Sequence, residues 1–489
     1  MPDLLHATQA ACGTLLALLC AALWLNRGGL RAALTGIPRG RWAALAAACA
    51  AGAALRWLVA PHQPTTFFDE YEHIDAARNL AEAGLFGRCD FRIDGTCLSH
   101  WLPQWPPAWH FLLSLAFRVV GPSETAAYAF NALVGAATIP LAFLAATVLL
   151  ESSGAGLAVA TLTALLPLHV KMSGSASPEV CSMAFMALTA LAAGLFLKAP
   201  GPRPALLLAC GACWAFLARA ENVVLAAPLA LLIATARPGG ARYVWPLLAL
   251  ALTPALLYLP GAREYYAKFA WPLHEGVSGL RLLAGNLGYW LWGPSVPTAL
   301  ALAAVWGALR GGTRTAWLAA WVLAVEAVYA FVHPVDLSTG DAHRLNLQVL
   351  LPVMLLAAWG ARDLLSRSGA RRAAMLGAAA ALFAVDLALR APFVSEDLAG
   401  SQERRDYVRL GEAASLPKDC IFATHSPPSV ITRLGRDAVH VRHLLDDAVV
   451  RGPLAGRRLV LVDDRWCRED PEGFCAAVKK RYGAGLTVW

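Results

Sequence analysis

The chain has 489 residues, of which 58% are hydrophobic and only 15% are charged, and its mean hydropathy is +0.52. A soluble globular protein carries about 25% charged residues, so this composition excludes a soluble enzyme, a fibrous protein and a disordered chain. The net charge of +8 does not point to nucleic acid, because the arginines fall mostly in short loops between apolar segments. The composition predicts an integral membrane protein.

Apolar segments bounded by charged residues, glycine and proline predict a polytopic α-helical protein with about twelve spans. The expected spans are residues 5–25, 42–60, 125–150, 155–171, 179–198, 204–219, 221–236, 243–260, 296–309, 316–332, 346–361 and 373–390. Short arginine-rich loops stay cytoplasmic, and the first loop contains Arg27, Arg31, Arg39 and Arg41. The segment after residue 60 is therefore expected on the outer side.

The later basic loops also fall inside if the short apolar stretch 108–120 does not span the membrane. This stretch contains His110 and Arg118, which predicts a helix lying along the outer surface. Two large segments then lie outside: a juxtamembrane loop over 61–124, within a membrane domain over 1–390, and a tail over 391–489.

The tail alternates strand-like and helix-like runs, which predicts a small α/β domain with a parallel sheet. The expected strands are Ile421–Thr424, Ala438–Val441, Arg458–Val462 and Leu486–Trp489, and the expected helices are Gln402–Ala414, His443–Val449 and Pro471–Tyr482. No glycine-rich phosphate loop follows a strand. The pair Asp463-Asp464 ends a strand, where a solvated loop is favoured over a ligand site.

Cysteine pairs lie in both outer segments, where an oxidising compartment permits disulfides. Cys89 and Cys97 in the loop are predicted to pair, with free thiols as the alternative, and Cys467 and Cys475 have the same spacing in the tail.

The outer loop begins with a dense group of ionisable residues, Asp69, Glu70, Glu72 and His73. Adjacent side chains cannot share one face of a helix, so Asp69 and Glu70 are expected to have different roles. One carboxylate can serve as a general base while its neighbour orients a substrate or a divalent metal. Asp69, Glu70 and His73 are the candidate metal ligands, and a helix N-cap at Asp69 is the structural alternative.

The order of several short motifs resembles the GT-C glycosyltransferases, in particular the protein O-mannosyltransferase and lipid A aminoarabinose transferase branch. The motifs are Asp69-Glu70-Tyr71, Ala76-Ala77-Arg78, Gly84-Leu85-Phe86, Trp105-Pro106-Pro107-Ala108-Trp109, Gly121-Pro122-Ser123-Glu124, Arg219-Ala220-Glu221, His343-Arg344 before Leu350-Leu351-Pro352, Thr424-His425-Ser426-Pro427 and Leu434-Gly435-Arg436. Many members carry a basic residue before the proline pair, where this chain has Trp105.

The resemblance implies a transferase with a sugar donor carried on polyprenyl phosphate and a lipid, glycan or protein acceptor. It implies Asp69 as the base, Glu70 in a supporting or metal-binding role, and inversion at the anomeric carbon. Substrate-binding candidates are Tyr71, Arg78, Trp105, Lys171, Arg219, Glu221, His343 and Arg344, with Arg344 ranked first for the phosphate, and Arg263 and Lys268 are further cationic candidates.

Two other functions remain open from the sequence, a transporter or lipid flippase and a noncatalytic scaffold of the same fold. Ionisable residues gather at the outer membrane edge, and few, such as Glu326 and Asp386, lie within spans, which favours the transferase. The Ala-, Gly- and Arg-rich composition suggests a bacterial plasma membrane with the active site facing the periplasm or exterior.

Overall fold

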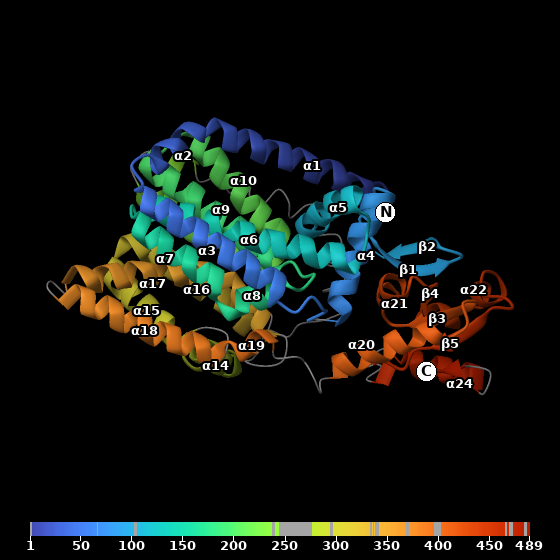
Figure 1. The fold of residues 1–489 in the computed structure, drawn as a ribbon. Helices are drawn as coiled ribbons and strands as arrows, with labels where there is room; N and C mark the ends of the chain where they lie inside the picture. The colour runs from blue at the N-terminus through green and yellow to red at the C-terminus, as the bar shows by residue number, and fades with distance from the viewer. Residues whose placement is uncertain are drawn as a thin grey trace.

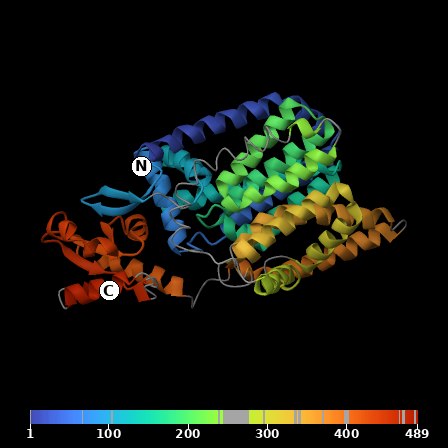
Figure 2. The ribbon, with the colours of Figure 1, turned by 180° about the vertical axis from the view of Figure 1, so that it is seen from behind.

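The structure is a computed structural model in which a bundle of helices carries a small α/β domain at one end (Figure 1). It describes residues 2–489 except 66, 102–104, 237–239, 244–275, 294–296, 333–334, 336, 338–341, 368–370, 396–401, 465–466, 469–472 and 484–486. The same arrangement is seen from behind in Figure 2, with the C-terminal domain beyond one end of the bundle.

The bundle and its connections contain most of the helices in the described residues. They are α1 (Pro2–Leu25), α2 (Arg27–Leu34), α3 (Arg39–Leu58), α4 (Phe67–Glu82), α5 (Ala108–Val120), α6 (Glu124–Leu149), α7 (Ser153–Leu165), α8 (Pro167–Ser173), α9 (Glu179–Lys198), α10 (Pro202–Ala218), η1 (Ala220–Leu225), α11 (Ala226–Ala236), η2 (Gly240–Tyr243), α14 (Gly276–Trp292), α15 (Thr298–Gly311), α16 (Thr313–Ala327), η3 (Val328–Val332), η4 (Ala342–Asn346), α17 (Leu347–Arg367), α18 (Arg372–Arg390) and α19 (Pro392–Ser395).

By length and apolar composition, six helices in the described residues can cross a membrane, or seven if the bent pair α7 and α8 forms one span. This is fewer than the twelve predicted spans, although every predicted span that is described coincides with a helix. The helices α10, α11 and α15 are shorter than the ~20 residues that a bilayer requires, and α3 contains three arginines. Residues 244–260 of one predicted span lie outside the described residues, and α14 was not predicted.

A 56° bend separates α7 from α8, and it begins where Pro167 provides no backbone N–H. Arg56 of α3, which is fully buried, donates to the carbonyl oxygens of Thr163 at 2.7 Å and Ala164 at 3.2 Å in the last turn of α7. These contacts satisfy carbonyls that the end of the helix leaves without partners. The bend thereby sets the direction of α8, which carries Lys171.

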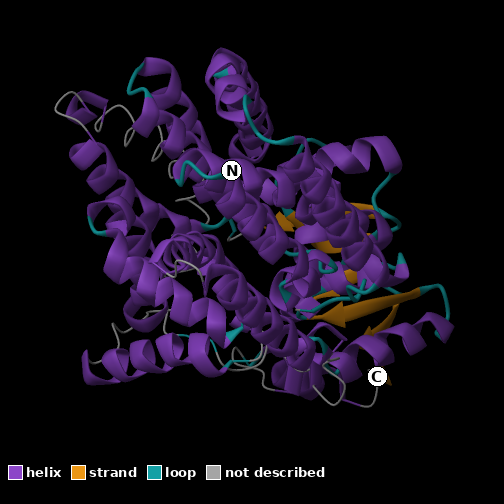
Figure 3. Ribbon diagram, turned by 60° about the vertical axis from the view of Figure 1, so that its left-hand side comes forward, coloured by secondary structure: helices purple, strands orange, loops and turns teal. Residues whose placement is uncertain are grey.

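The α/β domain is built on a six-stranded sheet with the order β2-β1-β4-β3-β5-β6. Strands β3 (Cys420–Thr424), β4 (Ala438–His440), β5 (Arg458–Leu461) and β6 (Thr487–Val488) are parallel, at the positions that the sequence predicts. Figure 3 shows that the strands occupy one part of the molecule and helices the rest.

The remaining two strands, β1 (Arg88–Ile93) and β2 (Thr96–Trp101), come from the outer loop and extend the sheet as an antiparallel hairpin. Asp94 and Gly95 form its two-residue turn with positive φ angles of 49° and 78°. The carboxylate of Asp437 accepts hydrogen bonds from both of their backbone N–H groups. Two segments more than 300 positions apart in the sequence therefore share one sheet.

Helices cover both faces of this sheet. They are α20 (Gln402–Glu412), η6 (Ala413–Ser415), α21 (Pro427–Leu434), η7 (Val441–Leu445), α22 (Asp447–Arg451) and α24 (Phe474–Tyr482). Alternate strand residues point to opposite faces, so Phe422 packs with α21 and α4, whereas Ile421 packs with α24 and η7. Helix α21 contacts α4 directly, and this contact joins the α/β domain to the start of the outer loop.

Disulfides close one small ring in each outer segment. Cys89 pairs with Cys97 across the hairpin with a Cα–Cα distance of 5.8 Å. Cys467 pairs with Cys475 in the tail at 5.5 Å, and both pairs are separated by eight positions.

Candidate active site

Asp69 lies in the first turn of α4, and Figure 1 shows α4 at the end of the bundle nearest the α/β domain. A helix N-terminus favours a negative charge, and the Asp69 carboxylate Oδ2 is 2.9 Å from Nη2 of Arg344. The Asp69 side chain is 38% exposed, whereas that of Arg344 is 13% exposed. Asp69 is therefore a solvent-accessible carboxylate held by a mostly buried guanidinium group.

The Asp69–Arg344 pair belongs to a longer ion-pair network, which also contains Glu179, Arg219 and Glu221. Nη1 of Arg344 is 3.6 Å from Oε1 of Glu179, and the same oxygen is 2.5 Å from Nη1 of Arg219. Arg219 donates to both oxygens of Glu221, at 2.6 Å and 3.2 Å. Three carboxylates and two guanidinium groups thus form one continuous network.

Helix ends bring this network together. Glu179 begins α9 after Pro178, Arg219 ends α10, and Arg344 lies in η4 just before α17. The acidic residue at a helix start and the basic residue at a helix end both have the sign that the helix dipole favours. The structure thus brings together four of the residues that the sequence predicts as catalytic or substrate-binding, namely Asp69, Arg219, Glu221 and Arg344.

Glu179 is the member of the network that the sequence analysis missed. Its side chain is completely buried, and its Oε2 has no hydrogen-bond partner among the described residues. The sequence does contain a signal for Glu179, because it is an acidic residue at the start of an otherwise apolar span. Because Glu179 contacts both arginines, it fixes the position of one relative to the other.

Glu70 turns away from this network and binds backbone instead. Its Oε1 accepts from the N–H of Thr65 and its Oε2 from the N–H of Ala176, both at 2.6 Å. The side chain is fully buried. Glu70 therefore holds the start of α4 against the segment after α8. In this way it helps to position the neighbouring Asp69.

His73 pairs with His110 of α5, with 2.8 Å between Nδ1 and Nε2, and its ring lies 4.5 Å from that of Trp105. Burial lowers the pKa of His73 well below its ordinary value, and burial lowers that of His110 to about 3. Both rings therefore favour the neutral form, and Trp105 packs on the His73 ring.

The three candidate metal ligands point to different partners: Asp69 to Arg344, Glu70 to backbone N–H groups, and His73 to His110. No group of three His, Cys, Asp or Glu side chains is arranged to hold a metal in the part of the chain that the structure describes. A divalent cation needs several convergent oxygen or nitrogen ligands, so these residues do not fit a metal site.

Tyr71 and Arg78 do not reach the network. Tyr71 is fully buried in the cluster of residues between α4 and the α/β domain. Arg78 lies more than two turns further along α4, where its Nη atoms are 3.4 Å from Asp75 and 3.4 Å from Thr432. Both predicted substrate-binding residues therefore hold α4 in place.

Lys171 and His343 meet on Phe393, beside the network. Nζ of Lys171 is 4.3 Å from the centre of the Phe393 ring, and the His343 ring contacts the same ring at 5.0 Å. His343 precedes Arg344 in η4. Burial and the nearby charges of Lys171 and Arg344 lower the pKa of His343 to about 4, so Lys171 is the cation of this pair. Arg263 and Lys268 lie outside the described residues.

The hairpin is joined to α4 by buried carboxylates. Asp75 accepts the backbone N–H of Cys89 at 2.6 Å, and Glu72 pairs with Arg88. Burial raises the pKa of Glu72 to about 7, although the charge of Arg88 opposes this shift. The Arg88 guanidinium lies over the ring of Trp101 at 4.9 Å.

A second anchor joins the hairpin to the tail through Asp90, which binds Arg442 and His443. Burial alone would raise the pKa of Asp90, but the hydrogen bond from His443 and the charges of His440 and Arg442 lower it to about 2. The hairpin is therefore held from both sides by buried carboxylates.

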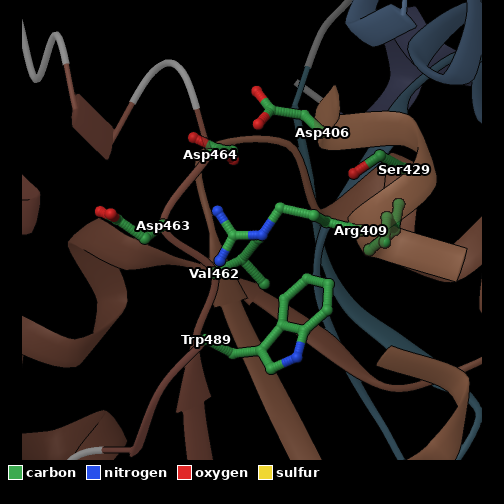
Figure 4. A pocket seen from close by; sticks show the side chains of 8 residues that line it. Asp406, Arg409, Ser429, Val462, Asp463, Asp464 and Trp489 are labelled. Carbon is green, nitrogen blue, oxygen red and sulfur yellow. The ribbon is translucent and has the colours of Figure 1, made fainter. Parts of the chain in front are cut away.

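A small pocket in the tail contains the Asp463-Asp464 pair (Figure 4). Asp464 is 4% exposed and accepts from Thr424 Oγ1 and the N–H of Cys467, so the expected solvated loop is wrong at this position. The cavity volume is ≈ 10 Å³, which is about the space of a single water molecule. Its carboxylates serve the structure of the domain.

Comparisons with known proteins agree with this architecture. Residues 104–260 match the family model described as dolichyl-phosphate-mannose-protein mannosyltransferase. The crystal structure of ArnT from Cupriavidus metallidurans bound to undecaprenyl phosphate superposes with a TM-score of 0.55 at 12% identity, over 92% of this chain and 90% of that one. The chain has the membrane-embedded fold of the GT-C glycosyltransferases.

The archaeal oligosaccharyltransferase AglB from Archaeoglobus fulgidus has the same GT-C fold. Its structure with an inhibitory peptide and a dolichol-phosphate has a TM-score of 0.50 at 13% identity, over 82% of this chain and 64% of that one. The present chain thus spans less than two thirds of that enzyme. The sequence matches none of the curated proteins.

Within this GT-C fold, the ion-pair network is shared between the matched segment and the rest of the chain. Glu179, Arg219 and Glu221 lie inside residues 104–260, whereas Asp69 and Arg344 lie outside them.

Proposed function

We propose that the protein is a glycosyltransferase that moves a sugar from a polyprenyl-phosphate-linked donor to a lipid, glycan or protein acceptor. The supporting observation is the network in which Asp69 is accessible and is paired with one of two coupled arginines. The GT-C fold gives this network its context, because the similar ArnT and AglB structures contain undecaprenyl phosphate and dolichol-phosphate.

Asp69 is the general base in this proposal. Its carboxylate is partly exposed, whereas both oxygens of the neighbouring Glu70 already accept backbone hydrogen bonds inside the protein. A base must come within hydrogen-bonding distance of the proton that it removes. Of the two adjacent carboxylates, Asp69 is the one that an acceptor hydroxyl can approach.

The transfer is a single displacement. Asp69 removes the hydroxyl proton of the acceptor while the hydroxyl oxygen forms a bond to the anomeric carbon of the donor sugar. The bond between that carbon and the phosphate oxygen breaks, and the polyprenyl phosphate leaves with the bonding electrons. Attack from the face opposite the phosphate inverts the configuration at the anomeric carbon.

Arg344 and Arg219 bind the phosphate of the donor and stabilise its charge as it leaves. A guanidinium group donates two parallel hydrogen bonds to phosphate oxygens. Lys171 and His343 contact the same Phe393 ring, and His343 directly precedes Arg344, so both add hydrogen-bond donors close to it. Preorganised cations of this kind stabilise charge that develops in the transition state.

The donor also releases the base. Nη2 of Arg344 lies 2.9 Å from Oδ2 of Asp69. A phosphate that binds Arg344 competes with this contact, so Asp69 becomes available to the acceptor hydroxyl when the donor is in place. The proposed order is donor first and acceptor second, and no step passes through a metal ion.

The active site faces the periplasm or exterior of a bacterial plasma membrane in this proposal. Nucleotide sugars are cytoplasmic, and an outward-facing site therefore needs a lipid-carried donor. The charge pattern of the predicted loops supports this orientation.

The test uses the purified full chain, a panel of labelled polyprenyl-phosphate sugars and native membrane extract as acceptor. We expect turnover of one donor, and Asp69→Asn should lower it by about 10²–10⁴, the usual effect of losing a positioned base. Asp363→Asn is the matched control, because Asp363 pairs with Arg367 near the end of α17, away from η4.

Near-normal turnover by Asp69→Asn would contradict the role of Asp69 as the base but not the proposed transferase activity. If the folded wild-type protein turned over none of the donors, this result would contradict the proposed transferase activity and favour a transporter or a scaffold.

A further inference from the structure

A large cavity lies at the end of the bundle opposite the ion-pair network. It is formed by the corner between α1 and α2 and by the connection between α9 and α10, and its volume is ≈ 950 Å³. Figure 1 shows α2 at the end of the bundle away from the α/β domain. The cavity is therefore separate from the proposed active site.

Four basic side chains line this cavity, Arg27, Arg31, Lys198 and Arg203, and no acidic residue does. None of the four forms an ion pair within the described residues, in contrast to Arg219 and Arg344. Like charges brought together without a counter-ion repel one another. The cavity has the charge of an anion-binding site.

Local contacts hold the cavity in shape. Asn26, which is 7% exposed, donates from Nδ2 to the carbonyl oxygens of Ala22 and Arg203 at 2.7 Å and 2.9 Å. This amide fastens the corner after α1 to the start of α10. Arg27 and Arg31 are one helical turn apart on α2 and therefore face the same side.

The cavity also lies where two apolar helices end, which is the level expected for lipid headgroups. The apolar spans Ala7–Leu25 and Glu179–Lys198 both end at it. Trp24 is 62% exposed there, and the Arg27 guanidinium lies 3.9 Å from the centre of its ring. Tryptophan and basic residues at the end of a span are typical of the membrane interface.

We infer that this cavity binds the phosphate headgroup of an anionic phospholipid from the leaflet opposite the active site. The phosphate lies between Arg27 and Arg31 on one side and Lys198 and Arg203 on the other. The acyl chains run along the exposed surface of Trp24 and Leu25, which also line the cavity. A soluble phosphate would use the same cations but not the apolar wall, so lipid is the occupant that both features favour.

Native mass spectrometry of the detergent-purified full chain, titrated with dioleoyl phosphatidylglycerol, tests this inference. We expect the wild type to retain phosphatidylglycerol and not dioleoyl phosphatidylcholine. The double variant Arg27→Gln/Arg31→Gln should bind phosphatidylglycerol about tenfold more weakly. Arg310→Gln/Arg371→Gln is the matched control, because it removes two exposed basic residues that do not line the cavity.

A second variant tests the cavity without changing its charge. A Cβ at Gly28 meets nothing within 4 Å, so Gly28→Leu fills open space while the four cations remain. We expect it to weaken phosphatidylglycerol binding as the charge variant does. Equal binding by the wild type and both variants would overturn the inference, and so would displacement of the lipid by equimolar glycerol 1-phosphate.

Discussion

Basic side chains at the two ends of the helical bundle differ in burial and in ion pairing. At the end next to the α/β domain, Arg219 and Arg344 are mostly buried and both are paired with carboxylates. At the other end, Arg27 and Arg31 are exposed, line a cavity and have no acidic partner in the described parts of the chain.

The difference follows from solvation. Removing an ion from water costs several kcal/mol unless an opposite charge compensates it, so the buried arginines near α4 come with carboxylates. In the proposed function, the phosphate of the donor takes the place of one of these carboxylates. Exposed arginines keep their hydration, and their binding partner can come from the membrane itself.

Replacement of Arg344 gives the largest effect among the tests of this comparison. Arg344→Ala should raise the apparent KM for the polyprenyl-phosphate donor by about a hundredfold, because a charged hydrogen bond contributes ~1.5–3 kcal/mol. The KM for the acceptor should change much less, as steady-state kinetics with each substrate varied can show. Arg371→Ala, an exposed arginine next to α18, serves as the control. Equal changes in both KM values would argue against a phosphate role.

The two disulfides allow a matched test of whether the hairpin next to α4 affects transfer. Both close rings of equal separation, so removing either should lower the free energy of unfolding by ~2 kcal/mol. Only Cys89→Ala/Cys97→Ala should also lower transfer, because the hairpin is fastened to α4. Thermal unfolding and turnover of that variant and of Cys467→Ala/Cys475→Ala would separate the two effects. Equal loss of transfer in both would contradict the local role of the hairpin.

Glu179→Gln probes the coupling between the two arginines. The variant keeps the Asp69–Arg344 and Arg219–Glu221 pairs but replaces the carboxylate that links the two arginines with a neutral amide. We expect the donor KM to rise about tenfold, equivalent to ~1.4 kcal/mol, with a smaller change in kcat. Glu326→Gln is the control, since Glu326 is an equally buried carboxylate that binds Trp290 instead. Identical kinetics of the two variants would assign Glu179 a purely structural role.

The sequence predicted the four parallel strands of the tail because alternating hydrophobicity and β-branched residues are local signals. It did not predict that a hairpin from the outer loop joins their sheet, although Asp94-Gly95 is a strong local signal for a hairpin turn. The pairing partner of an edge strand is a tertiary property, and β1 and β4 are far apart in the chain.

The candidate site shows the same division between local and distant information. Asp69 stood out because ionisable residues are dense at the start of the outer loop. That Asp69 contacts Arg344, and Arg344 contacts Glu179, depends on how α4, α9 and α17 pack. The adjacency of Asp69 and Glu70 predicted that their side chains make different contacts, but it did not predict the backbone partners of Glu70.

A pH dependence of stability is expected from Glu72, which lies one helical turn from Asp69 on α4. Its pKa is raised from 4.5 to about 7, chiefly by burial and against the charge of Arg88. The folded protein therefore holds a proton that the unfolded chain releases in this range. The resulting stability is present below pH 4.5 and is lost as the pH rises towards about 7.

Glu72→Gln should remove this pH dependence, whose slope is at most ~1.4 kcal/mol per pH unit for one proton. Unfolding temperatures measured from pH 4.5 to pH 7 check the prediction, and Glu82→Gln, in the last turn of the same helix, is the control. An unchanged slope in Glu72→Gln would mean that the carboxylate is ionised and fully compensated by Arg88. The hairpin would then be held to α4 by a permanent ion pair, as the arginines of the network are held to their carboxylates.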